Sequence, residues 1–153
     1  MRNLIIFAAV AFALAGCLGF GQSQTKADVS ANLDSPFLLK QNQTAYLASE
    51  NLLIRFLDVP SDSRCPIDVQ CVWAGEAGVR LGLQLATGAD TTGPSTEMIL
   101  VKGAGDDASV KVFKASNDAS YSIKLIRVDP YPRSNTTKES RDYTITLSVS
   151  KAS

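Results

Sequence analysis

The chain has 153 residues, with 15 Lys and Arg against 15 Asp and Glu, three Cys and no His. This length favours a single domain, and an apolar content of 45% is enough for a packed core. The lack of His excludes Ser–His–Asp and Cys–His catalysis and the usual imidazole-based metal sites. A net charge of zero gives no electrostatic basis for binding nucleic acid. We therefore expect no nucleic-acid partner, no metal and no cofactor.

The N-terminus has the pattern of an exported protein. Arg2 precedes an apolar run from Leu4 to Ala13, and small residues close the run before Cys17. This arrangement is typical of a secretory signal peptide. The apolar run is too short to span a membrane as a helix, which needs about 20 residues. The ending Leu14-Ala15-Gly16-Cys17 resembles the lipobox of bacterial lipoproteins. The alternative is an ordinary signal peptide in which Cys17 is incidental.

The lipobox resemblance implies a signal peptide over residues 1–16, cleavage before Cys17, and acyl chains (palmitate among them) on its thiol and its new amine. Two or three acyl chains hold a protein firmly on a membrane, so the resemblance implies a lipid anchor in the bacterial cell envelope. In the sorting pattern of such lipoproteins, an Asp directly after the lipidated Cys retains the protein in the inner membrane. This chain has Leu18 at that position. The resemblance therefore favours the outer membrane of a Gram-negative cell, with the domain facing the periplasm or the surface. Residues 17–35 are predicted to form the lipidated Cys17 and a flexible tether, because residues 18–35 are polar and without period. Residues 36–153 then form the folded domain.

The folded part is predicted to consist of short β-strands. Apolar and polar residues alternate with period two, and no long helical stripe is present. In chain order, the expected strands are Phe37–Lys40, Thr44–Ala48, Leu52–Val59, 79–85, Glu97–Lys102, Ser109–Lys114, 121–128 and 143–150. Leu52–Val59 is apolar on both faces, which favours a central position in a sheet. The expected fold is an antiparallel β-sandwich of seven or eight strands with immunoglobulin-like topology, and a small β-barrel is the alternative.

Cys65 and Cys71 stand close together in the middle of this domain. An exported protein favours a disulfide between them, and Pro66 would help the chain to turn. The ring is short, so the bond is expected to stiffen a loop rather than to hold the domain together. A redox pair lacks the Cys-x-x-Cys spacing, and two thiolates alone fall short of a zinc ligand set.

Other residues of the loop have two interpretations each. Trp73, two residues after Cys71, is expected first to pack against the core or the disulfide, and second to be an exposed recognition residue. Three carboxylates, those of Asp62, Asp68 and Glu76, could form an acid–base cluster. The opposing interpretation makes them ordinary loop charges paired with arginines: Arg55, Arg64 and Arg80.

The segments Asp62-Ser-Arg-Cys-Pro66 and Cys71-Val-Trp-Ala-Gly-Glu-Ala77 resemble a motif of small exported bacterial lipoproteins of uncharacterised function. Val128-Asp-Pro-Tyr-Pro132 matches their later Val-x-Pro-x-Pro element, and a final strand from Tyr143 fits the same pattern. The resemblance covers most of residues 37–150, and it implies no activity.

Three functions follow as hypotheses. The first is a non-enzymatic binding or accessory module of the envelope, whose stiffened loop contacts an envelope protein or polymer. Its candidate contact residues are Asp62, Arg64, Pro66, Trp73 and Glu76. The second is a protease inhibitor that presents the loop Ser63–Val72, and the third is an envelope hydrolase that uses the three carboxylates of the loop.

Overall fold

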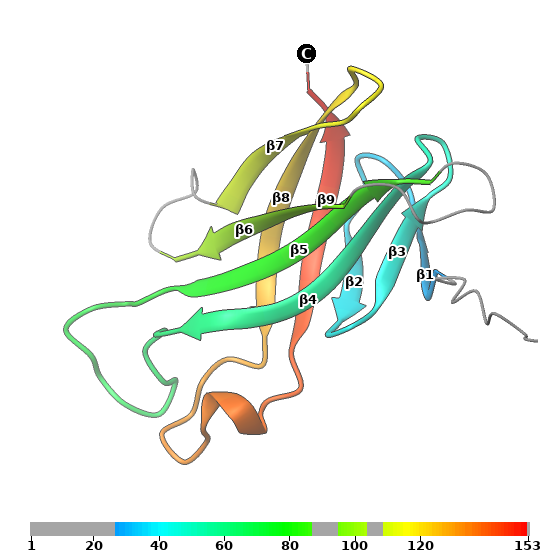
Figure 1. Cartoon of the computed structure of the whole chain (residues 1–153). Helices are drawn as coiled ribbons and strands as arrows, with labels where there is room; N and C mark the ends of the chain where they lie inside the picture. Colours follow the sequence, from blue (N-terminus) through cyan, green and yellow to red (C-terminus); the bar gives the residue numbers. More distant parts are fainter. Residues whose placement is uncertain (1–26, 87–94, 104–108, 153) are drawn as a thin grey trace, which may run out of the picture.

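A computed structural model describes residues 27–86, 95–103 and 109–152. Within these residues, nine strands form two layers (Figure 1). One sheet holds β1 (Val29–Ala31), β3 (Thr44–Leu47), β4 (Leu52–Asp62), β5 (Ala77–Leu85) and β6 (Thr96–Lys102), in that spatial order. The other holds β2 (Phe37–Lys40), β9 (Thr144–Lys151), β8 (Ser120–Asp129) and β7 (Val110–Lys114). The prediction of a β-sandwich is confirmed.

The strand order is simpler than that of an immunoglobulin domain. Strands β3 to β6 follow one another as antiparallel neighbours, and so do β7 to β9. The early chain alternates between layers, because β1 joins the first sheet, β2 pairs with β9 in the second, and β3 returns to the first. The immunoglobulin order instead interleaves distant strands in sheets ABED and CFG. The two sheets therefore form a β-sandwich in which most neighbouring strands are also consecutive in the sequence.

Burial follows the alternation of the sequence. Leu81 and Leu83 of β5 are fully buried, and so are Ile145 and Leu147 of β9, while the residues between them are partly exposed. The apolar faces of the two sheets thus form one core between the layers. The strand β4, apolar on both faces, lies in the middle of its sheet as expected.

The domain begins earlier than predicted. The sequence predicts that residues 28–35 belong to the tether, but β1 pairs in parallel with β3, and Ala31 is buried. The backbone N–H of Asp28 donates to the Thr44 carbonyl (2.8 Å), and the Asp28 carboxylate accepts from the Thr44 N–H (2.9 Å). A strand of three residues is too short to show a period, which is why the sequence did not reveal it. The predicted signal peptide, Cys17 and residues 18–26 of the predicted tether lie outside the described residues.

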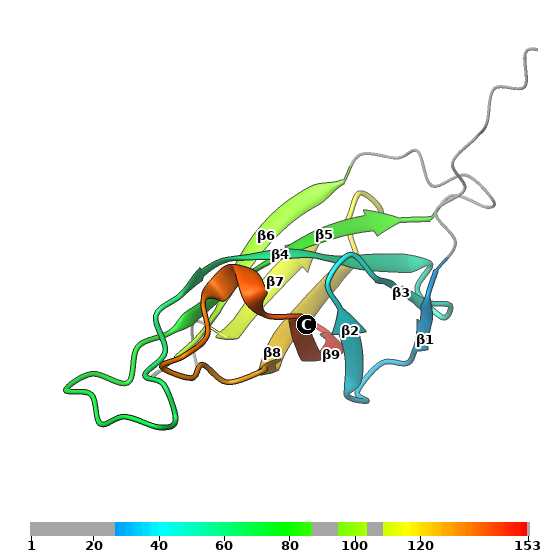
Figure 2. The ribbon, with the colours of Figure 1, turned by 90° about the horizontal axis from the view of Figure 1, so that it is seen from below.

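The connection between β4 and β5 extends from one end of the sandwich (Figure 1). The segment between β8 and β9, which includes the short 3-10 helix η2 (Lys138–Ser140), lies at the same end. Strand β1 lies at the opposite end in both views (Figures 1 and 2). None of the described segments is a helix long and apolar enough to cross a bilayer.

Candidate functional site

The β4–β5 connection, residues 63–76, contains the two cysteines and most of the resemblance motif. The N–H of Ser63 donates to the Glu76 carbonyl (2.8 Å), and the N–H of Cys65 donates to the Ala74 carbonyl (2.9 Å). Gly75 has a φ of +67°, and a Cβ there would lie 1.9 Å from the Ser63 carbonyl oxygen. Only glycine fits this position, because it alone has no Cβ to clash with that oxygen. At the base of the loop, the segments 63–65 and 74–76 are therefore hydrogen-bonded to each other and closely packed.

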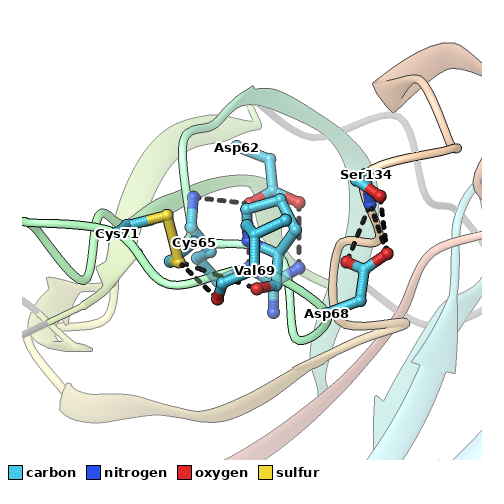
Figure 3. The surroundings of a disulfide bond; sticks show 8 residues. Asp62, Cys65, Asp68, Val69, Cys71 and Ser134 are labelled. Atoms are coloured by element: carbon cyan, nitrogen blue, oxygen red, sulfur yellow. Dashed lines mark hydrogen bonds and ion pairs between the residues drawn. A yellow bond between two sulfur atoms is a disulfide. The ribbon is translucent and has the colours of Figure 1, made fainter.

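The predicted disulfide is present. Cys65 and Cys71 are bonded, with their Cα atoms 5.9 Å apart, and the bond closes a small ring at the outer part of the loop (Figure 3). Pro66 lies half-buried inside this ring. Because both cysteines belong to the same short loop, the bond restrains this loop and links it to no other segment of the chain.

A buried ion pair holds the base of the loop. The side chains of Asp62 and Arg64 are 0% and 5% exposed. Arg64 Nε donates to Asp62 Oδ1 (2.8 Å) and Arg64 Nη2 to Asp62 Oδ2 (2.9 Å), so the contact is bidentate. This is the geometry in which an arginine binds a carboxylate most strongly. The prediction that Asp62 pairs with a neighbouring arginine is confirmed.

The same ion pair connects distant parts of the chain. Arg64 Nη1 donates to the Val128 carbonyl (2.6 Å) and Nη2 to the Pro130 carbonyl (3.0 Å), and its guanidinium lies 4.6 Å from the centre of the Tyr131 ring. The segment around Arg64 and the segment around Pro130 therefore meet in one cluster. Their contacts attach the base of the loop to the end of β8.

The Asp62 carboxylate has further donors from the C-terminal segment. Asp62 Oδ2 accepts from Arg141 Nη1 and from the Tyr143 hydroxyl, both at 2.9 Å. We call Asp62, Arg64, Arg141 and Tyr143 the base cluster. The contributions of Arg141 and Tyr143 could not be deduced from the sequence, because they lie 79 and 81 residues from Asp62.

The base cluster shifts two pKa values in opposite directions. Burial opposes ionisation of Asp62, but the hydrogen bonds from Arg64 and Tyr143 outweigh it and lower the pKa of the carboxyl group. Burial raises the pKa of Tyr143, and the neighbouring Asp62 charge acts in the same direction against the effect of Arg141. The cluster therefore contains an ionised Asp62 and a neutral Tyr143 at neutral pH.

A second contact fixes the loop from the side. Asp68 accepts hydrogen bonds from the backbone N–H of Ser134 (2.9 Å) and from its hydroxyl (2.6 Å), as Figure 3 shows. The N–H of Ile67 also donates to the Pro132 carbonyl (3.0 Å). The hydrogen bonds from Ser134 lower the pKa of Asp68. The loop is thus braced against the β8–β9 segment on both sides of Pro66.

The outer part of the loop is apolar and exposed. Val72 is 88% exposed and Trp73 82%, so the first interpretation of Trp73, as a core residue, is wrong. Trp73 lies beyond the end of the sheets, since β5 begins only at Ala77, and no core is available there for it to pack against. Three further large apolar residues at this end are exposed: Ile67 and Val69 of the loop, and Tyr131 of the β8–β9 segment, whose ring lies against the Arg64 guanidinium. We call these five residues the apolar tip.

The three carboxylates of the loop do not come together. Asp62 is buried in the base cluster, Asp68 binds Ser134, and Glu76 is exposed beside Ser63. Among the described residues, no group of three or more Asp, Glu, Cys or His side chains is arranged to hold a metal ion. Of the candidate contact residues, only Trp73 and Glu76 are exposed, while Arg64 is buried and structural.

The chain matches no protein-family model, no curated protein and no solved structure. A functional conclusion therefore rests on the geometry of the loop and on the residues of the N-terminus.

Proposed function

We propose that the chain is a lipid-anchored, non-enzymatic binding module of the bacterial cell envelope. The apolar tip is its contact surface, and its partner is an envelope protein with a complementary apolar pocket. The lipobox-like ending at Cys17 supports the anchor and the address. The observation that carries the binding function is the exposure of Val72 and Trp73 on a braced loop.

Exposing these apolar side chains to water is less favourable in free energy than burying them would be. Tryptophan is highly buried on average in folded proteins, and clustered exposed apolar residues mark interaction sites. Trp is also among the residues that contribute most binding energy at protein interfaces. Five of the eight large hydrophobic residues that are exposed in the described part of the chain lie on the disulfide loop or on the β8–β9 segment beside it. A partner that covers Trp73 would gain this apolar area.

The supports of the loop favour binding with little loss of entropy. The disulfide, the base cluster and the Asp68–Ser134 contact fix the backbone on either side of the tip. A loop that is ordered before association loses less conformational freedom when it binds. The tip also lies at the end of the sandwich remote from β1, the strand that follows the predicted tether in the sequence (Figure 2). This placement favours a partner that approaches from the side away from the anchor.

Two observations weigh against the other hypotheses. The hydrolase requires carboxylates that converge on a substrate, whereas the Asp62 carboxylate accepts hydrogen bonds from four side-chain donors of three residues. A strand-like inhibitor loop offers extended backbone, whereas residues 66–69 form a turn closed by the hydrogen bond from Val69 N–H to the Pro66 carbonyl (3.3 Å).

The decisive experiment compares exposed apolar residues inside and outside the tip. Cells that express the full chain are treated with a crosslinker. The amount of the complex between the chain and a different envelope protein is then quantified for the wild type, Trp73→Ser and Leu38→Ser. Leu38 is a matched control, because it is 61% exposed on β2 in the other sheet. We expect Trp73→Ser to reduce the product at least tenfold, with the melting temperature unchanged, and Leu38→Ser to have no effect.

Equal products from all three chains would contradict the proposal. Inhibition of a secreted protease by the chain at micromolar concentration would favour the inhibitor hypothesis instead. The anchor is tested separately, because incorporation of labelled palmitate must disappear in Cys17→Ala. A Cys17→Ala chain that stays equally membrane-bound would contradict the anchor and leave the binding function open to the first test.

A further inference from the structure

The outer faces of the two sheets differ in charge. Residues directly opposite each other in an antiparallel pair share a face, so the strand register assigns each side chain to the core or to the outside. On the sheet of β4, the outward charged residues are two basic and two acidic: Arg55, Arg80, Asp58 and Glu97. On the sheet of β9, they are four basic and one acidic: Lys40, Lys114, Lys124, Arg127 and Asp129. Within the described strands, the second sheet therefore has a net positive outer face and the first does not.

The basic residues cross the second sheet from one edge to the other. Lys40 lies on the edge strand β2 and Lys114 on the opposite edge strand β7, while Lys124 and Arg127 lie on β8 between them. The same register turns six hydroxyl side chains outward around them: Ser120, Ser122, Thr144, Thr146, Ser148 and Ser150. We call these four basic and six hydroxyl residues the basic face.

Two lysines of the basic face have no acidic partner. Arg127 pairs with Asp129 (Nε to Oδ2, 2.6 Å), and Lys114 lies 3.8 Å from Asp118 of the turn after β7. Lys40 and Lys124 are exposed, and neither ammonium group has an ion pair or a hydrogen bond to any of residues 27–86, 95–103 and 109–152. These two positive charges are therefore available to an anion from outside.

We propose that the basic face binds the surface of an anionic bilayer, so that the domain docks side-on against the membrane. Ammonium groups attract the phosphates of lipid headgroups, and Ser and Thr hydroxyls can donate hydrogen bonds to them. The choice of a bilayer rests on the lipid anchor of the proposed function. The inference adds a second contact, made by the folded domain itself.

The length of the chain before the domain favours this occupant. From Cys17 to Ala27 the chain can extend to about 35 Å at most. Attraction between basic residues and an anionic surface acts over about 8 Å at physiological ionic strength, so it needs a protein that is already close to the bilayer. An anchor at Cys17 keeps the domain within that reach and raises its effective concentration at the surface.

Apolar side chains at the margins of the basic face favour a bilayer over an anionic polysaccharide. Leu38 of β2 is 61% exposed and Val112 of β7 is 59% exposed, and the register turns both outward on this side of the sheet. Binding at a lipid surface gains from buried apolar area as well as from attraction to anionic lipids. A hydrated polysaccharide would use the lysines and leave these two side chains in water.

Docking on this face sets the direction of the apolar tip. Strands β8 and β9 lie along the axis of the sandwich that ends at the disulfide loop (Figure 1). A sheet that lies flat on the bilayer therefore directs the tip along the membrane. The envelope protein that covers the tip would then lie beside the domain on the same membrane.

Fluorescence quenching in vesicles tests this orientation. The full chain is reconstituted into vesicles that contain a nitroxide-labelled quencher lipid, made of phosphatidylcholine alone or of an equimolar mixture with phosphatidylglycerol. A fluorophore is attached at Ser148→Cys in the basic face, or at Ile99→Cys on the outer face of the first sheet. We expect quenching at position 148 in the anionic vesicles alone, lost at high salt because salt screens the attraction, and little quenching at position 99 in either.

Matched charge substitutions separate the basic face from the net charge of the chain. Lys124→Ser and Arg55→Ser each remove one positive charge from an exposed strand position. Lys124→Ser should reduce the quenching at position 148, and Arg55→Ser should leave it unchanged. The double variant Lys40→Ser, Lys124→Ser should lower the ratio of docked to undocked domain at least tenfold. Melting temperatures within a few degrees of the wild type show that the variants fold, and Lys→Gln replaces Lys→Ser where they do not.

Equal quenching at positions 148 and 99, or quenching that does not depend on lipid charge, would overturn the proposal. A fluorophore at position 148 that responds to dextran sulfate but not to anionic vesicles would also overturn it, because the face would then bind a polysaccharide. A palmitoylated chain without quenching contradicts the docking alone. Quenching of a chain that incorporates no palmitate contradicts the anchor and supports the docking. Trp73→Ser should leave the quenching unchanged, so the basic face and the apolar tip fail or succeed separately.

Discussion

The base and the outer part of the disulfide loop invert the usual distribution of residues. At the base, Asp62 and Arg64 are charged and buried, while a few residues further on Val72 and Trp73 are apolar and exposed. Charged residues are rarely buried unless they are paired, and Trp is rarely this exposed. The difference separates two roles within one short segment. The base cluster holds the loop to the domain, and the apolar tip is available to a partner.

The largest expected effect comes from breaking the base cluster. Asp62→Ala leaves the buried guanidinium of Arg64 without its carboxylate, and removal of one partner of a buried pair costs about 3–5 kcal/mol. Urea unfolding monitored by circular dichroism measures this loss. Asp68→Ala is the control, because its carboxylate lies at the surface, and it should have a much smaller effect. Equal losses would show that the buried pair is not what holds the loop.

Gly75→Ala should have the next largest effect. The substitution places a Cβ against the Ser63 carbonyl at a positive φ, so we expect a loss of about 1–3 kcal/mol. Gly82→Ala is the matched control, since a Cβ there would be in ordinary contact with the Leu57 side chain. Melting temperatures of the three chains report the difference. Similar melting temperatures for Gly75→Ala and the wild type would contradict the tight base.

Cys71→Ser tests the tip more than the base. Opening the short ring should cost about 2 kcal/mol in the chain-entropy model. The base cluster remains, so we expect partner capture to fall by a larger factor than folding stability does. Crosslink yield and urea unfolding measured on the same preparation give the two numbers. Equal free-energy losses would assign the disulfide a purely structural role.

Acid should weaken the base cluster by a smaller, graded amount. The pKa of Asp62 is lowered in the folded protein, so its contribution to stability is present above the unfolded value of about 3.8. The contribution is lost as the pH falls from there through the folded pKa. In Asp62→Asn this part of the acid dependence should disappear, which unfolding curves between pH 5 and pH 2 would show. An unchanged slope would mean that other carboxylates carry the dependence.

The regular part of the fold could be predicted because period-two alternation is a direct consequence of a sheet with one buried face. All eight expected strands are present, with ends shifted by three residues at most, as at Asp62 of β4. Strand β1 was missed because a short edge strand has no measurable period. The disulfide could be predicted from the expected export of the chain and from the short separation of Cys65 and Cys71 in the sequence.

The site was only partly predictable. The pairing of Asp62 with Arg64 was among the expected pairings, because the two are close in sequence. Arg141 and Tyr143 reach Asp62 only because the segment before β9 lies against the end of β4 in the other sheet, so their role depends on the topology. Trp73 was assigned to the core on residue type, and its position beyond the ends of the sheets reversed that interpretation.

The long sequence separations within the base cluster have a consequence for the order of folding. Synthesis from the N-terminus produces Asp62 and Arg64 well before Arg141 and Tyr143. Until the C-terminal segment is made, the two early charges have only each other, and the disulfide loop is attached to an incomplete domain. The base cluster is therefore completed last, and a chain truncated before residue 141 should be cleaved by added protease more readily than the full chain.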